Sequence, residues 1–312
     1  MKTMKAVCIY AYGGPGVLVY EDAPRPHPGD GEVLVRVHAA GINPVDWKIR
    51  EGHLKGRLHH TLPLVLGWDV SGVVEALGSG VTRLKVGDGV FSRPDISRDG
   101  AYAEFIVIKE SEVGLKPESI DHIHAAALPL AGLTAWQSLF DVGGLSAGQR
   151  VLIHAAAGGV GTLAVQLAKG KGAHVIGTAS ARNHDFLRQL GVDQVVDYQT
   201  VRFEEAVQAV DVVIDTMGGA IQERSWQVLK RGGILVSIVS PPSAEIAAAH
   251  GVRQAFVFIQ PNAAQLAEIA KLADADKLKA IVETILPLSD ATRGQELSER
   301  GHTRGKIVLR VV

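Results

Sequence analysis

The chain has 312 residues, of which 46% are hydrophobic and 21% are charged, and its formal net charge is -1. This balance is ordinary for a globular protein, and it excludes the dense basic surface that nucleic acid or an anionic membrane requires. The single cysteine, Cys8, excludes an internal disulfide framework, and neither a signal segment nor an apolar run near the ~20 residues of a membrane span is visible. We therefore expect a cytoplasmic protein.

Short alternating apolar runs, broken by glycine and proline, fill the chain from Lys5 to about Pro117, a pattern typical of an all-β region. A turn leading into a short helix is expected over residues 43–52. Cys8 lies in the first run and is expected to be a buried, inert thiol. The predicted strands are residues 5–10, 17–22, 32–42, 70–78 and 101–108.

From about Ser119 the pattern becomes helical, and Pro129 is expected to break or kink a helix over residues 125–144. Strands then alternate with helices, which predicts a parallel sheet covered on both faces. Asn262 is a plausible cap for a further helix. The last strands, residues 279–286 and 306–312, flank a charged helix over 289–300, and we expect this tail to return to the first domain. The alternating strands are residues 194–198, 211–216, 234–240 and 255–260.

Residues 151–180 contain a strand, a glycine cluster, an amphipathic helix and a second strand. Ala156, Gly158 and Gly161 have the spacing of a G-x-G-x-x-G motif whose first glycine is alanine. In a βαβ context this motif predicts a dinucleotide site, because backbone N–H groups at the helix start can face a diphosphate. The alternative is a glycine-rich turn without a ligand.

The end of the second strand of this unit indicates which nicotinamide cofactor binds. An NAD site usually has a carboxylate there for the ribose 2′-OH, but this chain has Ser180 and Arg182 and no carboxylate before Asp185. A hydroxyl and a guanidinium suit a 2′-phosphate. We therefore expect NADPH, the alternative for Arg182 being a solvated residue at a helix start.

Several common chemistries lack their residues. No Tyr-x-x-x-Lys pair and no P-loop sequence occur. A zinc site needs several Cys or His ligands at suitable spacing, whereas this chain has one cysteine and the adjacent pair His59 and His60, for which we expect a surface or packing role. No metal site is predicted.

Ten stretches together resemble the zinc-independent, quinone oxidoreductase-like (enone reductase) branch of the medium-chain dehydrogenase/reductase superfamily. They are GINPVDWKIREG, LGWDVSGVV, VGDGV, GAYAEFIV, ALPLAGLTAWQSL, VLIHAAAGGVGTLAVQLAK, VIGTASARN, DVVIDTMGG, GGILVSIVS and GHTRGKIVL. The resemblance implies a GroES-like β-rich catalytic domain (residues 1–124 and 285–312) and a Rossmann domain with a doubly wound parallel sheet that binds NADPH (residues 125–284). It also implies a homodimer, formed through an edge strand near residues 255–259.

The resemblance also implies site residues. Asn43 and Lys48 are the expected catalytic residues, and the alternative for Lys48 is an exposed helix residue. Asp46 is interpreted as a cap and Tyr102 as strand packing. Trp47, Leu62, Trp68 and Phe256 are expected to line the substrate or to pack in the core. The expected cofactor residues are Asn43, Thr134, Ala156, Gly158, Gly159, Val160, Gly161, Ser180, Arg182, Tyr198, Val239 and Phe258.

Zinc-using relatives have a ligand cysteine where this chain has Asn43 and a G-H-E motif at Gly67, Trp68 and Asp69. Without that Lewis acid, the expected reaction is hydride transfer from NADPH to a quinone or an α,β-unsaturated carbonyl, with oriented donors stabilising the oxyanion. The proton donor is left open. The alternative is an NADPH-binding sensor or interaction protein with little catalysis.

Overall fold

The computed structural model describes residues 2–312 and divides the chain into two compact units. The first unit contains the chain up to Leu130 together with residues 260–276 and 280–312, and the second contains residues 131–259 and 277–279. The tail therefore returns to the first unit, as the sequence predicts. No helix within residues 2–312 is long and apolar enough to cross a membrane.

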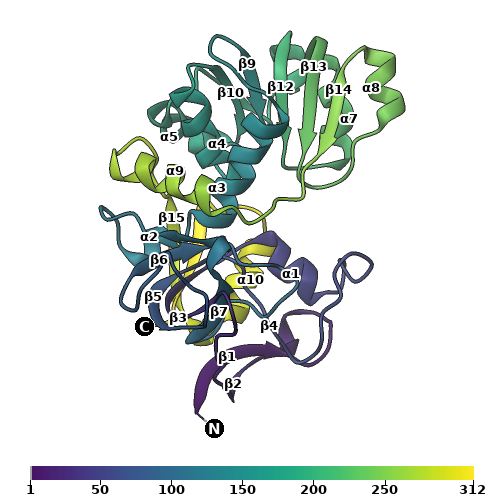
Figure 1. Cartoon of the computed structure of the whole chain (residues 1–312). Helices are drawn as coiled ribbons and strands as arrows, with labels where there is room; N and C mark the ends of the chain where they lie inside the picture. Colours follow the sequence, from purple (N-terminus) through teal and green to yellow (C-terminus); the bar gives the residue numbers. More distant parts are fainter. Residues whose placement is uncertain (1) are drawn as a thin grey trace. The chain divides into compact units, whose positions relative to one another are not determined.

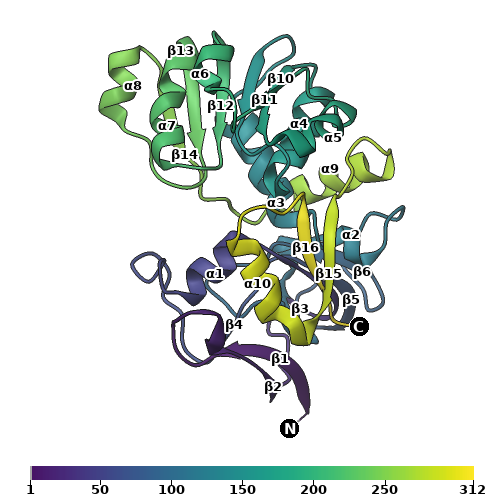
Figure 2. The same ribbon diagram turned by 180° about the vertical axis from the view of Figure 1, so that it is seen from behind.

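Two sheets form the β-rich first unit (Figures 1 and 2). The smaller sheet has the strand order β2-β1-β4. The larger sheet has the strand order β15-β16-β3-β5-β6-β8, and β7 also pairs with β3. The C-terminal strand β16 runs antiparallel to β3, with Ile307 opposite Ile42, so the last residues complete the N-terminal sheet. The strands are β1 (Thr3–Ile9), β2 (Leu18–Pro24), β3 (Glu32–Ile42), β4 (Leu64–Val65), β5 (Val70–Leu77), β6 (Gly89–Ser92), β7 (Phe105–Lys109), β8 (Val113–Leu115), β15 (Val282–Pro287) and β16 (Lys306–Arg310).

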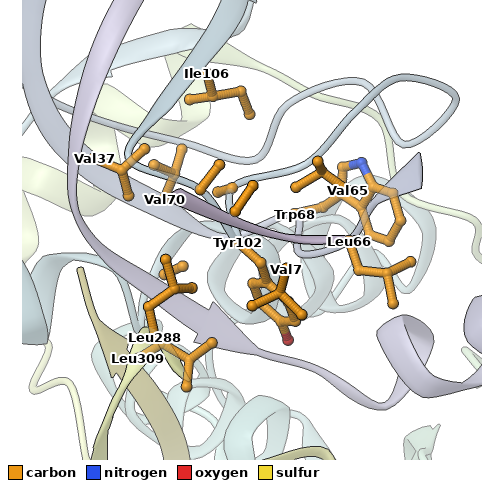
Figure 3. Packing of buried hydrophobic residues seen from close by; sticks show 14 of the residues in the cluster. Val7, Val37, Val65, Leu66, Trp68, Val70, Tyr102, Ile106, Leu288 and Leu309 are labelled. Atoms are coloured by element: carbon orange, nitrogen blue, oxygen red, sulfur yellow. The ribbon is translucent and has the colours of Figure 1, made fainter. Parts of the chain in front are cut away.

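The apolar residues of these strands pack into one core, part of which Figure 3 shows. Alternation along the strands places these side chains on one face, and their removal from water is the main stabilising contribution of the unit. Cys8 is buried here as expected, and burial raises the pKa of its thiol to about 11. The labelled core residues are Val7, Val37, Val65, Leu66, Trp68, Val70, Tyr102, Ile106, Leu288 and Leu309.

Helix α9 belongs to the first unit, which corrects the expectation that its residues are part of the Rossmann domain. Its cap is as predicted, because Asn262 Oδ1 accepts the N–H of Gln265 at 3.0 Å. Its last residue, Asp274, accepts the N–H of Ser119 at 2.9 Å, and its apolar side packs beside Gly114 of β8. The helices of this unit are η1 (Pro15–Val17), α1 (Pro44–Arg50), η2 (Glu110–Glu112), α2 (His122–Ala125), α9 (Ala263–Asp274), η6 (Leu288–Asp290) and α10 (Ala291–Glu299).

The second unit is a six-stranded parallel sheet with the order β11-β10-β9-β12-β13-β14. This is the doubly wound Rossmann order, with its switch point between β9 and β12. All six residues of β12 are buried. Because successive residues of a strand face opposite sides of the sheet, both faces of this sheet are covered. The strands are β9 (Arg150–Ile153), β10 (His174–Ala179), β11 (Gln194–Asp197), β12 (Val210–Asp215), β13 (Leu229–Ser237) and β14 (Arg253–Phe256).

The helix is broken at Pro129, the first of the two outcomes expected, because α2 ends at Ala125 and a new helix begins at Pro129. Proline is tolerated at the first helical position because its missing N–H has no partner there in any case. The helices from this point are α3 (Pro129–Trp136), η3 (Gln137–Val142, a π-helical turn), α4 (Gly159–Gly170), η4 (Ala181–Asn183), α5 (His184–Leu190), α6 (Phe203–Ala206), α7 (Gly219–Ser225), η5 (Trp226–Val228) and α8 (Ala244–His250).

Candidate active site and cofactor cradle

Asn43 stands where β3 ends and α1 begins. Its backbone is extended, Pro44 occupies the first helical position, and Asp46 closes the turn by accepting the Asn43 N–H at 2.8 Å. Asp46 is therefore the cap that the sequence predicts. The local sequence fixes Asn43 at a strand-to-helix corner, where its side chain is buried.

Asp46 also meets Tyr102, whose hydroxyl donates to Asp46 Oδ2 at 2.7 Å. Both side chains are fully buried, and burial raises the pKa of Asp46 to about 7 and that of Tyr102 well above its ordinary value. Tyr102 packs in the apolar core, as expected (Figure 3). Gly67 makes this placement possible, because a Cβ there would lie 2.2 Å from the Tyr102 ring.

Lys306, Asn43 and Asp69 form one buried hydrogen-bonded row. The Lys306 ammonium donates to Asn43 Oδ1 and, at 2.8 Å, to Asp69 Oδ2, which also accepts Asn43 Nδ2–H at 3.0 Å. An ammonium only donates and a carboxylate only accepts, so these neighbours fix the orientation of the Asn43 amide. Asp69 Oδ1 accepts the N–H of Leu130 at 2.7 Å.

The strand registers explain why these residues meet. Ile307 of β16 pairs with Ile42 of β3, so the next pair along is Lys306 and Asn43. The ladder between β3 and β5 ends at the pair of Ala40 and Val70. One residue further along β3, the Gly41 N–H donates to Asp69 O at 3.0 Å, so Asp69 lies next to the end of β3. The three side chains therefore lie at the same ends of three adjacent strands.

The Lys306 ammonium thus lies between Asn43 Oδ1 and Asp69 Oδ2. Within residues 2–312, no three His, Cys, Asp or Glu side chains are grouped so that they could hold a metal ion. His60 has the packing role expected for it, since its Nε2 lies 2.8 Å from Ile96 O and its ring lies beside Trp68.

Lys48 lies in α1 and is half-buried, so it is not the fully solvated residue of the alternative interpretation. Its Nζ is 5.5 Å from the centroid of the Trp47 ring, and burial lowers its pKa. Among the described residues it forms no hydrogen bond or ion pair with the row of Lys306, Asn43 and Asp69. The structure does not join the two expected catalytic residues directly.

Of the expected apolar substrate wall, Trp68 belongs to the core instead. It is fully buried, and its indole N–H donates to Arg98 O at 3.1 Å (Figure 3). Leu62 is partly buried against the same core. Core packing, the second interpretation of these residues, therefore describes Trp68, and both interpretations of Leu62 stay open.

The glycine cluster of the second unit forms a tight strand-to-helix turn. Ala155 has a positive φ of 46°, and Gly158 precedes α4 with no side-chain cap. A Cβ on Gly161 would lie 2.3 Å from Ala155 O, so only glycine permits this approach of helix and strand. The first N–H groups of α4, including those of Gly159 and Val160, have no acceptor within the helix, and N–H groups in this position can bind an anion.

The remaining expected cofactor residues of this unit follow the carboxyl ends of its parallel strands. Tyr198 comes after β11 and is 52% exposed, and Phe258, after β14, is 38% exposed. Val239 comes after β13 and is half-buried. Ligands bind at this edge in doubly wound sheets. Thr134 is buried within α3.

Ser180 and Arg182 lie at the end of β10, as expected, and the Arg182 side chain is exposed. Asp185, the nearest acid along the chain, lies in α5 and accepts Arg188 at 2.7 Å. No carboxylate is therefore in the position that binds a ribose 2′-OH in NAD sites.

Three polar residues that carry this geometry were not identified from the sequence. Lys306 begins a buried strand, where a lysine is unusual. A lysine at the start of an apolar run is therefore the sequence signal that could have identified it. Arg93 directly follows β6, and nothing around it in the sequence marks it. Asp215 ends β12 and accepts the N–H groups of Met217 and Gly218, which orders the turn after that strand.

Comparisons with known proteins agree with this architecture. Residues 29–118 match the family described as alcohol dehydrogenase GroES-like domain, and residues 190–309 match the zinc-binding dehydrogenase family. The mitochondrial NAD(P)H oxidoreductase RTN4IP1 of Mus musculus is 35% identical, covering 90% of this chain and 82% of the relative.

A 2-methylene-furan-3-one reductase of Solanum lycopersicum is 35% identical, covering 98% of this chain and 79% of the relative. Among solved structures, the quinone oxidoreductase of Coxiella burnetii superposes with a TM-score of 0.93 at 40% identity and covers 100% of both chains. These similarities extend over both units.

Proposed function

Because this chain belongs to the quinone oxidoreductase-like branch of the medium-chain dehydrogenase/reductase superfamily, we propose that it is an NADPH-dependent reductase of quinones or α,β-unsaturated carbonyls that acts without zinc. The names of its relatives support an oxidoreductase role with a nicotinamide cofactor. The observation that carries the finer proposal is the row of Lys306, Asn43 and Asp69.

The second unit fits the cofactor. Gly161 brings helix and strand together at the turn, and the uncapped N-terminus of α4 offers N–H groups to a diphosphate. Ser180 and Arg182 offer a hydroxyl and a guanidinium to a 2′-phosphate, which favours NADPH over NADH. The other proposed cofactor residues are Asn43, Thr134, Ala156, Gly158, Gly159, Val160, Tyr198, Val239 and Phe258.

When bound, the reduced nicotinamide supplies a hydride. The chain itself must stabilise the negative charge that develops on the carbonyl oxygen. Asn43 has a second Nδ2–H and Lys306 a third ammonium hydrogen that no described residue accepts. Both donors are held rigidly by Asp69, so little reorganisation is needed when the charge forms.

The same row supports the proposal that no zinc ion is used. A metal ion that used Asn43 and Asp69 as ligands would compete with the Lys306 ammonium for the same oxygens, and two cations cannot share them at this distance without strong repulsion. Lys306 supplies one fixed positive charge in this place. Lys48 is retained as a second proposed catalytic residue because burial already lowers the pKa of its amine.

NADPH oxidation with 1,4-naphthoquinone and with an enone tests the proposal. We expect turnover with NADPH and no loss of activity after dialysis against a chelator. Asn43→Ala should lower kcat by about 10² to 10³, the effect of removing one oxyanion donor. Arg25→Ala, which removes an ion pair with Glu75 elsewhere in the sheet, should leave kcat unchanged.

The alternative is an NADPH-binding sensor or interaction protein with little catalysis. It is favoured by the burial of Asp46 and Tyr102, which leaves the row without a solvent-exposed acid beside it. NADPH binding without turnover of either substrate would select it. A cytoplasmic location and a homodimer are also proposals; the mouse relative is named as mitochondrial.

A further inference from the structure

Arg50 and Arg93 are both at least nine-tenths buried, and they differ in their partners. Arg50 donates to Gly13 O, Gln295, Glu51 and Glu299 at 2.7 to 3.0 Å. Arg93 is 3% exposed, and its Nε is fully buried without a hydrogen-bond partner. A buried N–H group of a guanidinium without an acceptor is strongly unfavourable, so its place needs an explanation.

The sheet register shows where Arg93 lies. Ser92 of β6 pairs with Val70 of β5 in an antiparallel ladder, so the next pair is Arg93 and Asp69. Residues opposite each other in such a ladder project from the same face. Arg93 therefore follows β6 opposite Asp69, at the same edge of the sheet as the row of Lys306, Asn43 and Asp69.

The surrounding charges restrict what Arg93 can bind. Asp95, Glu112 and Asp69 all favour its charged form, although burial has the larger effect and lowers its pKa to about 10. A carboxylate or phosphate ligand would meet these three acids and be repelled. A neutral carbonyl oxygen would not, and a guanidinium can donate two parallel N–H groups to it.

We propose that Arg93 is a further substrate-binding and catalytic residue, which donates to the carbonyl oxygen of the quinone or enone together with Asn43 and Lys306. This inference rests on the proposed function and deepens it. It explains why the buried Nε–H has no acceptor among the described residues, since the acceptor is the substrate.

In the reaction with an enone, the hydride from NADPH forms a new C–H bond at the β-carbon and the C=C π bond breaks. Its electron pair moves to the carbonyl oxygen as an enolate, the substrate is reduced by two electrons, and the cofactor is oxidised to NADP⁺. A proton from solvent then completes the product at the α-carbon. Arg93 is needed most when the oxygen carries the full negative charge.

Arg93→Met, Arg93→Lys and Arg25→Met test the inference. Arg25 is the matched control, because its guanidinium stacks on Phe105 at 3.9 Å and pairs with Glu75 in the same unit. For each variant we would measure the melting temperature, NADPH affinity, kcat and KM with 1,4-naphthoquinone, and the affinity for that quinone in the presence of NADP⁺ by tryptophan quenching.

We expect Arg93→Met to melt at the wild-type temperature or higher, because it removes a buried charge whose Nε–H has no acceptor. Its kcat/KM should fall by about 10²-fold or more, with NADPH affinity within twofold of wild type, and Arg93→Lys should recover part of the loss. Arg25→Met should keep wild-type kinetics.

A lower melting temperature with unchanged kcat/KM for the folded Arg93→Met protein would overturn the inference and make Arg93 structural. So would unchanged kinetics at unchanged stability, while the proposed function would stand. If the wild-type protein turns over no quinone or enone, the proposed function fails, and quinone affinity decides alone: weaker binding by Arg93→Met supports the inference, and equal binding overturns it.

Discussion

Lys306 and Asp69 lie 237 residues apart in the sequence, yet the ammonium and the carboxylate are 2.8 Å apart with side-chain exposures of 6% and 0%. Removing one partner of a buried pair leaves an uncompensated charge. Lys306→Met should therefore lower the free energy of unfolding by about 3 to 5 kcal/mol, measured by urea denaturation.

A second variant separates the ion pair from the packing of Lys306. Asp69→Asn combined with Lys306→Met removes both charges, and it should recover a large part of the stability lost in Lys306→Met. Lys271→Met, which removes an exposed ion pair with Glu268, should change the stability by less than about 1 kcal/mol. Additive losses in the double variant would show that the pair is not coupled.

Gly161 and Gly170 lie in the same helix and make a matched pair for testing the cradle. A Cβ at Gly161 would be 2.3 Å from Ala155 O, whereas nothing lies within 4 Å of a Cβ at Gly170. Gly161→Ala should weaken NADPH binding and lower the melting temperature, because strand and helix must separate. Gly170→Ala should be neutral or slightly stabilising, since alanine favours a helix by about 1 kcal/mol. Equal behaviour of the two variants would contradict the cradle.

Arg182 is the residue expected to distinguish NADPH from NADH. Arg182→Ala should weaken NADPH binding about 10- to 150-fold, the equivalent of losing a charged hydrogen-bond partner worth ~1.5 to 3 kcal/mol. NADH binding should stay unchanged, because NADH has no 2′-phosphate. Arg188→Ala removes an exposed arginine whose partner is Asp185 and is the control. Unchanged NADPH affinity in Arg182→Ala would refute the assignment of the 2′-phosphate site.

Asp46 should make the stability depend on pH. Its pKa rises from 3.8 to about 7 on folding, mainly through burial, so the folded state binds more protons than the unfolded state between these values. The free energy of unfolding therefore decreases as the pH rises through this window. Asp46→Asn mimics the protonated acid and should show a flatter stability profile from about pH 4 to pH 7. If the free energy of unfolding of the wild-type protein instead increased with pH between about pH 4 and pH 7, and this increase disappeared in Asp46→Asn, the raised pKa of Asp46 would be contradicted.

Local patterns predicted most of the fold. The expected strand over residues 32–42 coincides with β3, and the Asn262 cap forms as predicted, because both depend on residues close together in the sequence. Pro129 shows the limit: proline predicts a disturbed helix, but whether it lies inside or at the start depends on the preceding residues, which form the separate helix α2.

The candidate site was less predictable because its residues are brought together by the pairing of strands that are distant in the sequence. Asn43 was found through a family motif, and Asp46 through the spacing of a cap. Lys306 joins the row, and Arg93 reaches the same edge, only because β16 lies beside β3 and β6 beside β5, and strand order is a long-range property. The one local signal in the sequence is the lysine at the start of the apolar strand β16, because a buried lysine needs an acidic partner.

The pairing of β16 with β3 also has a consequence for how the protein is synthesised. The second unit takes nearly all of its residues from one continuous stretch, 131–259, so it can fold as soon as that stretch has left the ribosome. The first unit cannot do so, because the carboxylate of Asp69 lacks the Lys306 ammonium, and residues 39–42 of β3 lack their β16 partner, until the last strand is translated. During synthesis the chain therefore has a finished Rossmann sheet while its N-terminal sheet is incomplete, and the unpaired end of β3 over residues 39–42 is where aggregation of nascent chains should begin.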